Sequence, residues 1–206
     1  MEKEKDFSWE IRHYKEVDST NLVALDLALR GEKEGVVIVA EKQHQGRGKG
    51  GREWFSPSGG LWLSLLLKPD FFPPSLSYFN LLGALGVTRT IKGLFPWLDP
   101  VFKPPNDVYL GGQKVAGILT QTRTKKGKLD FAIVGIGVNL NLEKFPPSLK
   151  TKATSLRLKT GMFTPPSEFL SALLEEIKRL YFLLRKDPLK LKKEAESLFS
   201  FSEEGV

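Results

Sequence analysis

Segment 43–57 reads QHQGRGKGGREWFSP, and its composition decides how the rest of the chain is interpreted. Four glycines alternate there with Arg47, Lys49 and Arg52. Glycine lets a backbone approach a ligand closely, and the cations attract phosphate or carboxylate groups. Apolar runs at residues 36–40 and 61–67 flank the segment and predict two strands. We therefore expect an anion-binding loop that is held by a sheet.

Known glycine-rich nucleotide motifs do not fit this loop. Gly46, Gly48 and Gly51 match the spacing of a dinucleotide-binding turn, but an aromatic stretch with a proline follows where that motif opens a helix. A P-loop would need Lys and then Ser or Thr after Gly51, where the chain has Arg52 and Glu53. A solvated basic turn remains the alternative on composition alone.

The overall composition indicates one globular domain that meets anionic partners. The chain has 206 residues, 41% of them hydrophobic, which is enough for a sizeable core. It has no cysteine and only His13 and His44, which argues against thiolate metal sites, a cysteine nucleophile and histidine-based triads. The net charge of +7 favours anionic partners, nucleic acid among them. The charged start without an apolar core, and the absence of a long apolar run, predict a cytoplasmic protein without membrane spans.

Strand and helix patterns alternate along the first half of the chain. A strand is expected at residues 9–17, and the oxygen-rich run 18–21 should cap a helix that ends at Gly31. That helix would carry three leucines on one face: Leu22, Leu25 and Leu29. A second apolar-faced helix is predicted from Ser75 or Ser77 to Leu94, and two glycines within it would allow close packing.

Helical periodicity returns in the last quarter of the chain. After Pro165 and Pro166 the apolar spacing predicts a core helix, in which Glu175 and Arg179 should pair on the outer face. A further amphipathic helix is expected through Leu198. Together these elements predict one α+β domain.

A hairpin at residues 103–119 holds the second group of candidate residues. Gly111 and Gly112 separate two apolar runs, and this turn would place Tyr109 opposite Lys114 and Asp107 opposite Ala116. Asp107 and Lys114 then share one face, where a surface ion pair worth less than about 1 kcal/mol is the simpler interpretation. A third apolar strand at residues 129–142 contains the run GIGVNLN, in which glycines mark close approach by a ligand or backbone.

Four segments together resemble the biotin protein ligase family, also called biotin-[acetyl-CoA-carboxylase] ligases. They are residues 18–21 (DSTN), 46–57, 103–119 and 134–139 (VGIGVN), in the family order and over nearly the whole chain. The resemblance implies a mixed, largely antiparallel central sheet with flanking helices. It also implies a two-step reaction, in which biotin and ATP form biotinyl-5′-adenylate and a lysine of a biotin carboxyl carrier protein then takes the biotin. Neither step needs an enzyme nucleophile, so positioning and positive charge should carry the catalysis.

The resemblance assigns roles by position within these motifs. Lys114 and Arg47 would be catalytic. The biotin-binding set would be Ser19, Thr20, Asn21, Gln43, Arg47, Gly48, Lys49 and Lys114. The ATP and adenylate set would be Arg52, Trp54, Asn106, Asp107 and Asn139. The last three would face phosphate, Mg²⁺ or ribose, and no metal ligands are assigned.

Two residues depart from the family pattern. Lys49 stands where the family has Arg, and because Lys lacks a planar fork, looser retention of the adenylate is expected. Pro104 stands where the family has Trp, which removes an aromatic wall.

The resemblance also bears on domains and partners. The catalytic domain is expected at residues 1–198, and 199–206 would be a short tail where a small C-terminal β domain usually begins. No DNA-binding extension is expected at the start, so neither is a repressor role or nucleic-acid binding. A homodimer formed through the sheet is expected. The alternatives are a lipoate or octanoate transferase of related fold, whose motifs we do not find, and a non-enzymatic nucleic-acid-binding module.

Overall fold

The computed structural model describes residues 8–198. In chain order the elements are β1 (Glu10–Val17), α1 (Thr20–Leu29), β2 (Val36–Gln43), the short 3₁₀ turn η1 (Lys49–Gly51), β3 (Leu61–Leu67), α2 (Tyr78–Leu94), β4 (Pro100–Lys103), β5 (Asp107–Leu110), β6 (Gln113–Lys125), β7 (Lys128–Val138), α3 (Leu156–Thr160), α4 (Pro166–Lys186) and α5 (Pro188–Glu196). Each expected strand and helix within this range is present. The expected tail at residues 199–206 lies outside the described residues.

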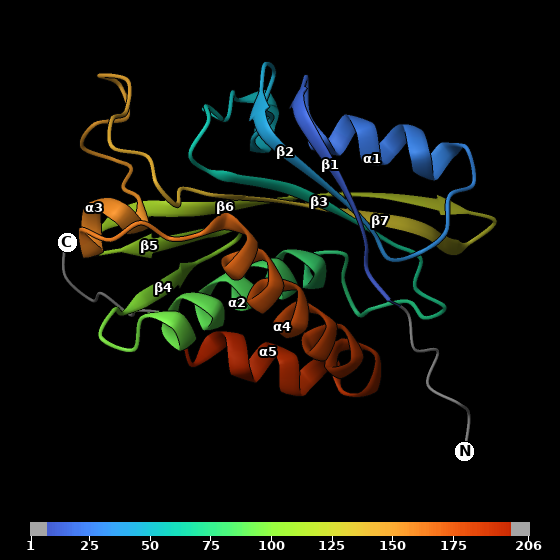
Figure 1. Ribbon diagram of the computed structural model, residues 1–206. Helices are drawn as coiled ribbons and strands as arrows, with labels where there is room; N and C mark the ends of the chain where they lie inside the picture. Colours follow the sequence, from blue (N-terminus) through green and yellow to red (C-terminus); the bar gives the residue numbers. More distant parts are fainter. Residues whose placement is uncertain (1–7, 199–206) are drawn as a thin grey trace.

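The strands form one seven-stranded sheet in the order β1-β2-β3-β7-β6-β5-β4. β1 pairs with β2 in parallel, and every other neighbouring pair is antiparallel. Helix α1 lies on one face of the sheet, and α2, α4 and α5 cover the other (Figure 1). This arrangement confirms the expected α+β class with a mixed, largely antiparallel sheet.

Most apolar side chains are buried on the side of the sheet that carries three helices. There the alternate residues of β2, β3, β6 and β7 meet the apolar faces of α2 and α4 in one continuous core. The two glycines of α2 allow close packing, as expected. A methyl group on Gly83 would approach Ile118 of β6 at 3.0 Å, and one on Gly86 would approach Ile177 of α4 at 2.6 Å. The opposite face, left with only α1, has room for a ligand cleft beside that helix.

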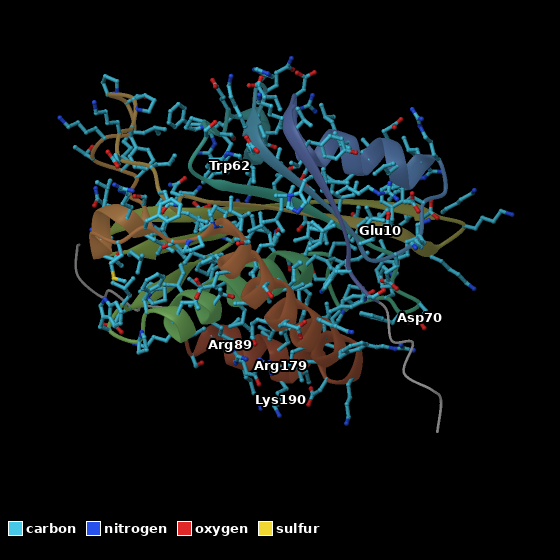
Figure 2. The ribbon with its side chains drawn as sticks, viewed as in Figure 1. Glu10, Trp62, Asp70, Arg89, Arg179 and Lys190 are labelled. Atoms are coloured by element: carbon cyan, nitrogen blue, oxygen red, sulfur yellow. The ribbon has the colours of Figure 1, made fainter. Side chains whose placement is uncertain are left out.

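Ion pairs join the three helices on the covered face. Arg89 of α2 bonds Glu176 of α4 at 3.1 Å and Glu194 of α5 at 2.8 Å. Arg89 and Arg179 both project from this helical layer (Figure 2). Arg179 pairs with Glu176 at 2.8 Å, so the expected partner Glu175 was wrong by one residue. A spacing of three residues is as compatible with a helical ion pair as a spacing of four.

Helix α1 buries a different face from the one expected. Leu29 is 56% exposed, whereas the buried residues are small or polar: Thr20, Asn21, Ala24 and Ala28. Small side chains let α1 lie close to β2, β3 and β7. Of the expected leucine face, Leu25 is partly buried against the small core on this side of the sheet, while the start of the helix faces the polar end of the cleft.

The β5–β6 hairpin differs from the expected register by one residue. Tyr109 lies opposite Lys114 as expected, but a β-bulge between Val108 and Tyr109 sets Asp107 opposite Gly117 rather than Ala116. A bulge inserts an extra residue into one strand, which turn chemistry alone does not indicate. Asp107 and Lys114 still meet on one face, as their 2.6 Å contact shows.

Among the described helices, none has the length and apolar content that crossing a bilayer requires.

Candidate functional site

One cleft of about 320 Å³ lies on the α1 face of the sheet. Its walls are the loop before β3 and the segment between β7 and α3, which both rise above that face (Figure 1). The cleft gathers all the candidate residues, from four separate segments of the chain: Ser19, Thr20, Asn21, Gln43, Arg47, Gly48, Lys49, Arg52, Trp54, Asn106, Asp107, Lys114 and Asn139. The fold therefore brings the sequence-predicted set together.

Glycines form the floor of the cleft. A methyl group on Gly117 would lie 2.9 Å from the Trp54 ring, and one on Gly137 would lie 2.4 Å from its indole nitrogen. A methyl group on Gly135 would lie 2.1 Å from the Asn21 side-chain oxygen. Side chains at these positions would fill the cleft or displace its walls. The glycines of β7 do mark a close approach, but it is made by the side chains of Asn21 and Trp54 rather than by backbone, and an approach by a ligand stays a prediction.

Polar side chains form a connected network at the α1 end of the cleft. Gln43 Oε1 accepts from the Thr20 backbone N–H at 2.8 Å and lies 3.1 Å from Thr20 Oγ1. Gln43 Nε2 donates to Ser56 Oγ at 2.9 Å. Asn21 Nδ2 donates to the Leu119 carbonyl at 3.2 Å. Because α1 begins here, Ser19 also lies in the wall, and its side chain makes no capping bond to the helix.

The glycine-rich loop folds back on itself as a small hairpin. Gly48 N donates to Arg52 O at 2.7 Å, and Trp54 N donates to Gly46 O at 2.8 Å. Gly50 at the tip has a φ of 71°, a conformation that glycine adopts without strain. Arg47 and Lys49 are exposed and have no carboxylate partner among residues 8–198. Their charges are therefore available to an anion in the cleft.

Lys114 lies at the other end of the cleft, near the start of β6 and just after the hairpin turn. Its ammonium is 2.6 Å from Asp107 Oδ1 and 4.8 Å from the centre of the Trp54 ring. The side chains of Lys114 and Asp107 are 25% and 23% exposed, so the pair is half-buried and is not the surface pair that was the simpler interpretation. Burial, with a smaller contribution from Asp107, raises the pKa of the neighbouring Tyr109 phenol.

The segment that covers this end of the cleft is tied to the Lys114 backbone. Lys114 N donates to Lys152 O, and Thr154 N donates to Lys114 O, both at 2.9 Å. Phe145 and Leu149 from this segment add apolar lining. Two hydrogen bonds therefore join the covering segment to the backbone that carries the Lys114 side chain.

Asn139 and Asn106 use their side chains to hold backbone. Asn139 Nδ2 donates to Thr154 O at 2.9 Å, and Asn106 Nδ2 donates to Ile118 O at 2.9 Å. Both residues line the cleft. Each leaves a side-chain oxygen that can face a ligand, but their first evident role is to shape the cleft.

Sequence reasoning missed several residues of the site. Ser64 and Gln121 belong to the polar network, and Tyr109, Phe145 and Leu149 line the cleft. Ser64 carried a usable signal, because it is one hydroxyl in an otherwise apolar strand, LWLSLLL. The other four carried no local signal, since only the folded sheet and its cover bring them to the cleft.

The cleft has the chemistry of a binding and charge-stabilising site. No thiol is present, and no group of three metal-ligating side chains exists among the described residues. One end offers side-chain oxygens, glycines form the floor, the other end offers the Lys114 ammonium, and the glycine-rich loop adds the Arg47 guanidinium. Such a site suits a flat ligand with a polar head and an anionic tail.

Comparison with known proteins agrees with this geometry. The sequence model of the biotin/lipoate A/B protein ligase family matches residues 14–139. The bifunctional ligase/repressor BirA of Bacillus spizizenii is 37% identical over 148 residues, which are 70% of this chain and 45% of that protein. A biotin–[acetyl-CoA-carboxylase] ligase of Paracoccus denitrificans is 36% identical over 161 residues, covering 76% of this chain and 66% of the relative. The chain thus spans about half the length of the BirA relative.

A solved structure shares the fold. The biotin protein ligase of Aquifex aeolicus in complex with biotin and ATP superposes with a TM-score of 0.80 at 34% identity, covering 93% of this chain and 78% of that one. The family match spans more than half of the chain and includes all four motif segments in full. By sequence and by fold, the chain belongs to the biotin/lipoate A/B protein ligase family.

Proposed function

We propose that the protein activates biotin with ATP to biotinyl-5′-adenylate and transfers the biotin to a lysine of a carrier protein. One observation carries the proposal: a single cleft joins an end rich in hydrogen-bond acceptors to an end with Lys114, across a floor of glycines, and Arg47 of the glycine-rich loop also lines it. A ureido head, a flat ring and a carboxylate tail would match these three parts in order. The relatives named for this activity, and the solved relative with biotin and ATP, support it.

Each end of the cleft has a distinct role in this reaction. Ser19, Thr20, Asn21 and Gln43 would bind the ureido head. Arg47, Gly48 and Lys49 would close over the ligand. The Lys114 ammonium would stabilise the negative charge that grows as the biotin carboxylate attacks the α-phosphate and pyrophosphate leaves. No proton transfer is needed in that step, because the attacking carboxylate is already ionised.

The nucleotide would occupy the side of the cleft near the hairpin. Arg52 and Trp54 would flank it, and Asn106, Asp107 and Asn139 would face its phosphates or ribose. Mg²⁺ commonly binds through one or two carboxylates together with substrate phosphates. Asp107 and the free side-chain oxygen of Asn106 fit that pattern, and the ion would neutralise charge on the leaving pyrophosphate.

We further propose a biotin carboxyl carrier protein as the acceptor and a homodimer as the assembly. The carrier lysine would attack the carbonyl of the adenylate, with AMP leaving. For the dimer, support comes from β6. Its pairing with β5 runs from Gln113 to Gly117, so within the described part of the chain no strand pairs with the outer edge of residues 120–125. Open edges pair readily with a second copy. The need for ATP and for a carboxylase subunit favours the cytoplasm.

A lipoate or octanoate transferase is the nearest rival within the family. Lipoate has no N–H group in its ring, so the side-chain oxygens at the α1 end would lose water without gaining hydrogen bonds. A buried acceptor left unpaired costs about 1–3 kcal/mol. This mismatch favours biotin.

The decisive test is biotin-dependent exchange of label between pyrophosphate and ATP. We expect exchange with biotin and none with lipoate, and a higher melting temperature with biotin than with lipoate. Exchange that depends on lipoate would reverse the choice of substrate. No exchange with either acid, together with strongly salt-dependent binding of RNA or DNA, would instead favour the nucleic-acid module.

A further inference from the structure

A buried serine lies directly behind the polar end of the cleft. Ser64 is fully buried in β3, between Leu63 and Leu65. Its hydroxyl oxygen is 2.6 Å from Asn21 Oδ1 and 2.8 Å from Thr20 Oγ1. Thr20 and Asn21 line the cleft, whereas Ser64 does not. Ser64 therefore contacts the site only through these two side chains.

The amide of Asn21 has one possible orientation. Its Nδ2 faces the Leu119 carbonyl and Gln121 Oε1, each at 3.2 Å. A carbonyl oxygen can only accept, so the amide nitrogen must face it and Oδ1 must face Ser64. Gly135 makes room for this arrangement, because a methyl group there would lie 2.1 Å from Asn21 Oδ1. The strands β6 and β7 thereby determine which atom Ser64 meets.

Counting protons then determines the direction of the network. Asn21 Oδ1 cannot donate, so the single Ser64 proton goes to it. The 2.8 Å contact between Ser64 and Thr20 therefore needs the Thr20 proton. The Thr20 hydroxyl then has no second proton for Gln43 Oε1. The distance between Thr20 Oγ1 and Gln43 Oε1 is the longer one, 3.1 Å, and Gln43 Oε1 already accepts the Thr20 backbone N–H. Thr20 Oγ1 donates its proton to Ser64, so toward the cleft both Thr20 Oγ1 and Gln43 Oε1 can only accept.

We infer that Ser64 and Asn21 are positioning residues that make Thr20 Oγ1 and Gln43 Oε1 accept, and not donate, hydrogen bonds from a ligand. The inference rests on the proposed function and names the property by which the site selects its substrate: a head group with N–H donors. A ligand N–H would extend one chain of bonds, from ligand to Thr20 to Ser64 to Asn21, in which each bond polarises the next. Without Ser64, the Thr20 hydroxyl would be free to turn and the selection would weaken.

The test compares biotin with its two mono-N-methyl derivatives, each of which lacks one ureido N–H. Dissociation constants are measured by calorimetry for the wild type and for Ser64→Ala. We expect Ser64→Ala to weaken biotin binding about fivefold to tenfold, the usual effect of losing one hydrogen bond. The derivative that lacks the N–H facing Thr20 should be much less affected. The ratio of the two affinities should therefore shrink by a similar factor, while any steric penalty of the methyl group cancels.

Thr88→Val is the matched control. Thr88 is a buried hydroxyl that donates to Ala84 O within α2, on the other face of the sheet. This variant should change the melting temperature without changing the affinity ratio. If Ser64→Ala does not fold, Ser64→Cys keeps a side chain of similar shape that donates and accepts only weakly, and it should shift the ratio in the same direction.

The outcomes separate this inference from the proposed function. A wild type that binds biotin and catalyses exchange, with an affinity ratio unchanged within twofold in the Ser64 variants, would overturn the inference alone. A wild type that does not bind biotin would overturn both. A ratio that shrinks in the Ser64 variants and not in Thr88→Val would support the inference.

Discussion

Replacement of Lys114 by Ala should separate the fold of this protein from its chemistry. The ammonium has two neighbours, Asp107 at 2.6 Å and the Trp54 ring at 4.8 Å. A partly exposed ion pair contributes about 1 kcal/mol and a cation–π contact about 0.5–1 kcal/mol. The unfolding free energy should therefore fall by about 1–2 kcal/mol, which lowers the melting temperature by about 2–8 °C in a chain of this size.

The loss in adenylate formation should be larger. An ammonium about 3 Å from a phosphate oxygen gains about 5 kcal/mol at an effective dielectric constant of 20, before desolvation is subtracted. Losing one such contact typically lowers the rate about 10²- to 10³-fold, or about 2.7–4 kcal/mol. Single-turnover formation of biotinyl-adenylate measures this step directly. Lys114→Arg should restore little of it, because a planar guanidinium does not replace a compact charge.

Lys103→Ala is the matched control. Lys103 also lies over an aromatic ring, 5.0 Å from Tyr109, but it is exposed and does not line the cleft. Its replacement should leave adenylation near the wild-type rate. Transfer from adenylate supplied ready-made must be assayed separately, because it bypasses the first step. Near-normal single-turnover adenylation by Lys114→Ala would refute the assigned role.

Three further results are expected. Gly86→Ala should destabilise the fold by about 1–3 kcal/mol, because its methyl would lie 2.6 Å from Ile177. Gly93→Ala in the same helix has open space and should stabilise the fold by up to about 1 kcal/mol, so equal melting temperatures of the two variants would contradict this packing. Lys49→Arg should slow the release of biotinyl-adenylate, because a guanidinium fork holds phosphate with two bonds. Filter binding after a chase with unlabelled ligand measures this rate, and unchanged release would show that residue 49 does not contact the adenylate. Amide hydrogen exchange at residues 46–52 should be fast in the free protein and slower with biotin and ATP, because the four glycines retain much backbone freedom. Slow exchange without ligand would exclude a loop that closes on binding.

Sequence by itself determined the local elements and the motif set. Period-two and helical patterns located the strands and helices because each depends on neighbours a few residues away. Glycines with interleaved cations indicated the anion-binding loop, and Gly111-Gly112 indicated the hairpin, since both depend on local backbone freedom. All the candidate residues proved to line one cleft.

Only the tertiary structure decided the finer features of the site. The bulge at Val108 and Tyr109 moved Asp107 opposite Gly117, and α1 buried small residues in place of its leucines. Ser64 and Gln121 joined the polar network from strands far from α1 in the sequence. Such features depend on which strands become neighbours and on how closely helix and sheet approach, so no local pattern encodes them. The direction of hydrogen bonding at the cleft is set in the same way, because it follows from one backbone carbonyl of β6 that holds the amide of Asn21.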